Sequence, residues 1–156
     1  MKLAIIRTGI LTLAVALAPA LVQADTPGRH PAYLRARTDL RTAQALTRVN
    51  EEPNVMRNLR AADREIDVAV RQIDRAAVID RKDIDDHPRP DAGLDRMGRF
   101  RKIVELLRSS RMDLAREEDN GAARGWRNAA YQHIDAALEL MHRAAVDLRI
   151  DHELGF

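Results

Sequence analysis

Residues 80–95 read DRKDIDDHPRPDAGLD and form the only long interruption between helical patterns in the sequence. Pro88 and Pro90 cannot both lie inside a helix, and Pro88 disfavours the helical conformation for His87, so the backbone has to turn here. The sequence on each side of this segment has the pattern of a helix pair. The segment therefore divides the chain into two helical halves, and it also holds the densest group of carboxylate side chains.

Four segments, at about 31–48, 53–78, 95–117 and 123–150, show the spacing of apolar residues that one buried face of a helix requires. The pattern is clearest in the second segment, where apolar residues follow one another in steps of four and three: Val55, Leu59, Ala62, Ile66, Ala69, Ile73 and Ala76. Pro31 and Pro53 stand at the expected helix starts, where proline is favoured.

Alanine recurs every seven residues along three of these apolar seams: Ala36 and Ala43, then Ala62, Ala69 and Ala76, and finally Ala130, Ala137 and Ala144. Alanine lets two antiparallel helices approach to the short end of the ~8–10 Å range of interaxial distances. The third helix supplies larger side chains instead. Because the connections at 49–53 and 118–122 are short, we predict an all-α, up-down-up-down four-helix bundle with alanine-rich seams.

The first 24 residues have the features of a secretory signal peptide. Lys2 and Arg7 precede an apolar run at 10–17, and Val22-Gln23-Ala24 supplies small residues for cleavage. We expect cleavage after Ala24, a single domain at 25–156 and a location in the periplasm or outside the cell. The apolar run is about half the roughly 20 residues needed to cross a bilayer, and no later segment approaches that length, so we expect no membrane span in the mature chain.

The composition argues against several classes of function. The chain has no cysteine, which excludes disulfides and thiol catalysis. Without Lys2 and Arg7 the 26 basic residues fall to 24 and equal the 24 acidic ones, and aromatic residues make up only 3% of the chain, so we expect no nucleic-acid partner. We attribute the preference for arginine over lysine to a genome rich in G and C. No phosphate-binding loop or nucleophile motif is present, so we expect a protein that is not an enzyme.

The 80–95 segment is the best candidate for weak binding of a divalent metal ion or a small ligand. The predicted metal ligands are Asp83, Asp85, Asp86 and His87, joined by His133, with His30 as a further donor. Carboxylates with one imidazole suit a hard or borderline divalent cation, although their spacing does not match an EF-hand. In the alternative interpretation the aspartates cap the flanking helices, and His133 hydrogen-bonds to a carboxylate such as that of Asp135 or is solvated.

Several stretches of the chain resemble a group of small exported bacterial helical proteins of uncharacterised function. They are His30-Pro31-Ala32-Tyr33-Leu34 with Asp39-Leu40-Arg41, Asp85-Asp86-His87-Pro88-Arg89-Pro90-Asp91, Glu117-Glu118-Asp119-Asn120 with Ala123-Arg124-Gly125, and His133-Ile134-Asp135-Ala136-Ala137. The resemblance covers most of the mature chain and implies a compact periplasmic bundle. The segment His133-Ile134-Asp135 is also similar to the helical repeats of small periplasmic metal-binding proteins, which are far richer in histidine.

Two hypotheses follow. In the first, the protein is a non-catalytic periplasmic bundle that binds a divalent metal ion or small ligand weakly through residues 80–95. In the second, it is a structural or protein-interaction bundle without a ligand, and its outer helix faces, rich in arginine and acidic residues, contact an unknown protein partner. The broad apolar face of the third helix, which includes Val104 and Leu106, leaves room for a homodimer.

Overall fold

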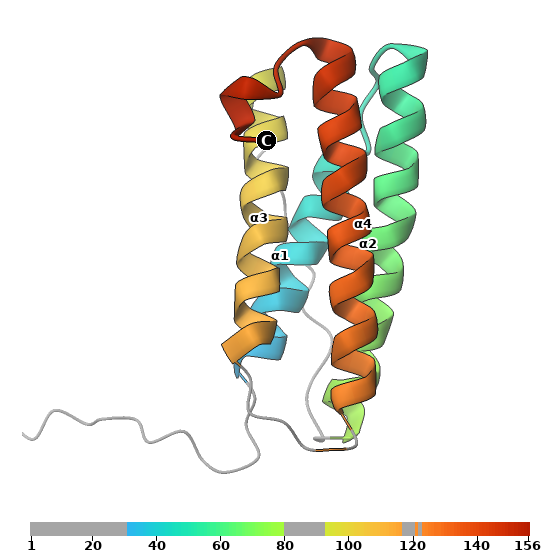
Figure 1. Cartoon of the computed structure of the whole chain (residues 1–156), viewed down its shortest axis with the longest axis vertical. Helices are drawn as coiled ribbons and strands as arrows, with labels where there is room; N and C mark the ends of the chain where they lie inside the picture. The colour runs from blue at the N-terminus through green and yellow to red at the C-terminus, as the bar shows by residue number, and fades with distance from the viewer. Residues whose placement is uncertain (1–30, 80–92, 117–120, 122) are drawn as a thin grey trace, which may run out of the picture.

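The computed structural model describes residues 31–79, 93–116, 121 and 123–156, which form an all-α bundle (Figure 1). Its elements are α1 (Pro31–Thr47), α2 (Pro53–Ile79), α3 (Arg96–Arg116), α4 (Arg124–Leu148) and a final turn of 3-10 helix, η1 (His152–Leu154). Each α-helix begins and ends within two residues of the range expected from the sequence. The predicted signal peptide lies outside the described residues. No helix in the described part of the chain is long and apolar enough to cross a membrane.

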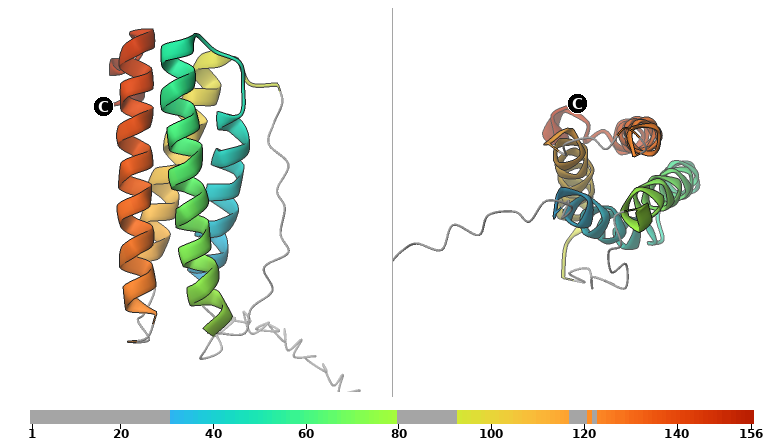
Figure 2. Two further views of the ribbon diagram at one scale, coloured as in Figure 1. Left: turned by 90° about the vertical axis from the view of Figure 1, so that its right-hand side faces the viewer. Right: turned by 90° about the horizontal axis from the view of Figure 1, so that it is seen from below.

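The helix directions differ from the predicted up-down-up-down order. Arg99, in the first turn of α3, lies 2.6 Å from Glu51, which precedes α2. Arg35, near the start of α1, contacts Asp113, near the end of α3, at 3.4 Å. Helices α2 and α3 therefore start at the same end of the bundle and run parallel, whereas α1 and α3 are antiparallel (Figures 1 and 2). The observed order is up-down-down-up.

The length of the connection between α2 and α3 permits this arrangement. Helix α3 has 21 residues, which corresponds to about 31 Å at a rise of about 1.5 Å per residue. An extended chain covers roughly 3.3 Å per residue, so the segment 80–95 has enough residues to join opposite ends of the bundle. The prolines require a turn but do not require a hairpin. A four-helix bundle with a long crossover connection is an established alternative to the hairpin arrangement.

The closest helix packing also differs from the expected pairs. Helix α2 packs most extensively on α4, and α1 packs on α3, whereas the contact between α3 and α4 is smaller. Seen along the bundle axis, the order around the bundle is α1, α2, α4, α3 (Figure 2). All six seam alanines of α2 and α4 are completely buried: Ala62, Ala69, Ala76, Ala130, Ala137 and Ala144. The small residues therefore lie where two helices that are distant in sequence come together.

The core consists largely of residues that the helical pattern assigns to it. The apolar seam of α2, from Val55 to Ala76, is at most 1% exposed at each of its seven positions. Val104 and Leu106 are also buried within the single chain, so they do not supply the exposed apolar face that would leave room for a homodimer. Trp126 lies four residues before Ala130 on the spacing of the α4 seam, but it is 36% exposed and lies under the guanidinium of Arg75, 4.9 Å from the ring centroid.

Candidate functional site

The predicted metal ligands are described only in part. Four of them lie outside the described residues, and so does His30; the four are Asp83, Asp85, Asp86 and His87. Within the described ranges, no three His, Asp or Glu side chains are grouped closely enough to hold a metal ion. The prediction of a metal site in the 80–95 segment therefore stays a prediction.

His133 is described and lies between two helices. Its Nδ1 atom is 2.7 Å from Oε2 of Glu65 on α2, and both side chains are about one-third exposed. Asp135, the carboxylate expected from the sequence, instead accepts a hydrogen bond from Arg111 at 2.7 Å. His133 thus pairs with a carboxylate of the facing helix, because the close packing of α2 on α4 brings Glu65 within reach.

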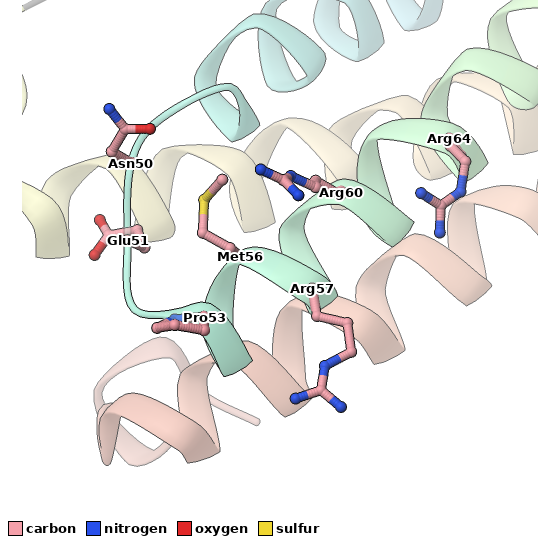
Figure 3. Close-up of a pocket in the computed structure, with 7 residues that line it drawn as sticks. All are labelled: Asn50, Glu51, Pro53, Met56, Arg57, Arg60 and Arg64. Atoms are coloured by element: carbon pink, nitrogen blue, oxygen red, sulfur yellow. The ribbon is translucent and has the colours of Figure 1, made fainter.

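A surface pocket of about 460 Å³ lies where the connection between α1 and α2 meets the first turns of α2 (Figure 3). We call it the arginine pocket, after three of its lining residues. The residues that line it are Asn50, Glu51, Pro53, Met56, Arg57, Arg60 and Arg64.

The three arginines share one side of α2 because of their spacing. Arg57, Arg60 and Arg64 are three and four residues apart, opposite the buried seam, and all are exposed. None of the three forms an ion pair with any residue in the described part of the chain. In Figure 3 the guanidinium of Arg60 is directed toward Met56 and the connection, whereas those of Arg57 and Arg64 are directed away from the connection. The pocket therefore carries positive charge that the surrounding protein does not neutralise.

The carboxylate of Glu51 borders the pocket but is already engaged. Its Oε1 atom is 2.6 Å from Arg99 and its Oε2 atom is 2.8 Å from Arg96, and the side chain is only 1% exposed. Arg96 also reaches Glu52 at 3.3 Å. Because two arginines of α3 share the charge of Glu51, this carboxylate does not offset the arginines of α2.

A second surface pocket, of about 440 Å³, lies between α1 and α3 and contains two carboxylates, Asp39 and Asp113. Burial raises the pKa of Asp39, a hydrogen bond with Ser109 opposes this rise, and the neighbouring carboxylate of Asp113 adds to it. Arg35 contacts Asp113 at 3.4 Å and offsets part of the charge. This pocket therefore contains both negative and positive side chains. It offers no group of three side chains that could hold a metal ion.

The arginine pocket was not among the sites predicted from the sequence, where the arginines were attributed to base composition and the candidate ligands were carboxylates and histidines. A partial signal was present, because Arg57, Arg60 and Arg64 share a helix face. Only the structure shows that they lack a carboxylate partner among the described residues, since Asp63 lies three positions from Arg60 and Asp67 three positions from Arg64. Pairs at that spacing are the usual partners of a helical arginine.

Comparisons of the chain with protein-family models, with curated proteins and with solved structures found no match.

Proposed function

We propose that the chain is an exported, non-catalytic helical bundle that acts by binding, and that it binds an anionic group in the arginine pocket. The observation that carries this proposal is the set of three exposed arginines without a carboxylate partner in the described part of the chain. The sequence features of residues 1–24 support a location in the periplasm or outside the cell.

The chemistry of arginine supports an oxyanion as the ligand. A guanidinium presents planar N–H groups that match the oxygens of phosphate, sulfate or carboxylate in pairs. Like charges three or four residues apart on a helix repel one another, so an anion bound among Arg57, Arg60 and Arg64 also relieves that repulsion. The side-chain amide of Asn50, at the rim of the pocket, adds a further donor.

The lining of the pocket favours binding over catalysis. It contains no histidine, serine or threonine, and its one carboxylate, that of Glu51, is held by Arg96 and Arg99. A general base and a nucleophile within reach of each other are therefore not present among the lining residues.

A calorimetric titration of the chain from Asp25 with inorganic phosphate and with sulfate tests this proposal. We expect saturable binding that weakens by about tenfold in Arg60→Gln, because one charge-assisted hydrogen bond is lost. Arg101→Gln is the matched control, since Arg101 is exposed on α3 and forms no described ion pair. Absence of binding with both anions, or equal losses in the two variants, contradicts the proposal.

One observation favours weak binding of a divalent metal ion as a second candidate function. Nδ1 of His133 faces Glu65, and no described hydrogen bond uses its Nε2 atom. A histidine that binds a metal through one ring nitrogen usually bonds a carboxylate or carbonyl through the other. In this candidate His133 joins the carboxylates and His87 of the 80–95 segment.

A further inference from the structure

The arginines of α2 continue beyond the arginine pocket. Arg71 and Arg75 lie on the same exposed side of the helix as Arg57, Arg60 and Arg64. We call these five residues the arginine stripe. At a rise of about 1.5 Å per residue, the stripe extends over about 27 Å of the helix. It is therefore much longer than any single small anion.

The acidic residues of α2 leave most of this charge exposed. Three of them are bound to side chains outside α2: Asp63 to Arg48 at 2.9 Å, Glu65 to His133 at 2.7 Å and Asp74 to Arg37 at 2.5 Å. Asp67 forms an ion pair with Arg71 of the stripe. The outer face of α2 thus keeps a positive surplus, although the expected mature chain is neutral overall.

The stripe lacks the apolar centre that a protein partner normally contacts. The large hydrophobic side chains exposed in the described part of the chain are Leu34, Met112, Trp126, Val146 and Phe156, and none of them belongs to α2. Protein interfaces usually have an apolar or aromatic core, whereas attraction to a charged surface requires only arginine or lysine. Trp126, which stacks under Arg75 at one end of the stripe, has an amphipathic ring of the kind found at membrane interfaces.

We propose that the arginine stripe docks the bundle lengthwise on a layer of anionic lipid headgroups. This inference rests on the proposed binding of anions in the arginine pocket and adds a source for them, the phosphates of a lipid surface. The stripe offers positive charges at repeated intervals along a convex helix face, and an anionic bilayer offers phosphates at every point of that line. No apolar side chain of the stripe enters the bilayer, so the attachment is electrostatic and reversible by salt.

Co-sedimentation with lipid vesicles tests the docking. The chain from Asp25, with its helicity checked by circular dichroism, is mixed with phosphatidylcholine vesicles that contain or lack phosphatidylglycerol. We expect binding only to the anionic vesicles, with release at high salt. Each arginine removed lowers the binding constant by about fivefold, so Arg57→Gln/Arg64→Gln lowers it by about 25-fold. The matched control, Arg101→Gln/Arg116→Gln, removes the same charge from α3 and leaves binding nearly unchanged.

A second variant separates this inference from the proposed function. Arg71 and Arg75 do not line the arginine pocket, so Arg71→Gln/Arg75→Gln should weaken binding to anionic vesicles and leave phosphate binding unchanged. Phosphate binding without vesicle binding overturns the docking and retains the pocket. Equal vesicle losses in the α2 and α3 variants, or equally tight binding to soluble polyglutamate, also overturn the docking on lipid. Vesicle binding without phosphate binding overturns the proposal that the arginine pocket binds an anion.

Discussion

The Nη2 atom of Arg99 lies 2.6 Å from Oε1 of Glu51, and this ion pair joins the starts of α2 and α3, which the whole length of α2 separates in the chain. The Glu51 side chain is 1% exposed and that of Arg99 is 18% exposed. Removal of one member of a buried ion pair is costly because the other charge remains buried without its partner. The pair therefore stabilises the arrangement in which α2 and α3 start at the same end of the bundle.

Replacement of Arg99 tests the contribution of this ion pair. We expect Arg99→Met to lower the free energy of unfolding at neutral pH by roughly 3 kcal/mol, at the low end for a broken buried pair because Arg96 still contacts Glu51. Urea denaturation followed by circular dichroism measures the change. The double variant Glu51→Gln/Arg99→Met should recover part of the loss. A loss no larger than that of the exposed control Arg101→Met would show that the pair contributes little.

Cross-linking tests the parallel arrangement of α2 and α3. The chain has no cysteine, so introduced cysteines are its only thiols. Glu52 and Arg96 approach to 3.3 Å, and we expect Glu52→Cys/Arg96→Cys to react rapidly with a short bis-maleimide. Arg75→Cys/Arg96→Cys should react slowly, because Arg75 lies toward the other end of α2. Mass spectrometry of the digested protein identifies the linked peptides. Faster reaction of Arg75→Cys/Arg96→Cys would contradict the parallel arrangement and support the up-down-up-down order.

The positions of the helices and most of the core were predictable from the sequence because they depend on local periodicity. Steps of four and three place Val55, Leu59 and Ile66 on one face whatever the helix packs against. The direction of α3 was not predictable in this way. Periodicity is the same for a helix running up or down, and a long connection permits both.

Charged residues inside the bundle are a second feature that the apolar pattern did not predict. Arg37 is only 1% exposed, and its Nε atom lies 2.5 Å from Asp74 on α2. A pattern of apolar residues assigns every arginine to the surface. Only the structure, which places Asp74 beside Arg37, shows that this arginine is buried. The same limit concealed the arginine pocket, since lack of a partner is also a property of three-dimensional structure.

The carboxyl group of Asp39 gives a prediction about pH. Burial raises its pKa in the folded protein, so folding favours the protonated form. The associated stability is present below the pKa of the unfolded chain and is lost as the pH rises through the folded pKa. We therefore expect Asp39→Asn to raise the thermal unfolding midpoint by a few degrees at pH 7, and the difference to vanish near pH 3. Glu153→Gln, a change at an exposed carboxylate of η1, serves as the control. A midpoint difference independent of pH would rule out Asp39 ionisation as the cause.

Addition of metal tests the proposed role of His133. After treatment with a chelator, we expect zinc to raise the unfolding midpoint of the chain from Asp25 by several degrees, because an ion that binds the folded state stabilises it. His87→Ala should abolish the rise. If Glu65 orients the ring of His133 for metal binding, Glu65→Gln should weaken zinc affinity by about tenfold, as is common for a carboxylate that supports a histidine ligand. His142→Ala is a suitable control, since its ring stacks on Phe156 with centroids 4.8 Å apart, away from Glu65. An unchanged midpoint with zinc, copper, nickel and calcium would exclude the metal site and leave the arginine pocket as the binding site.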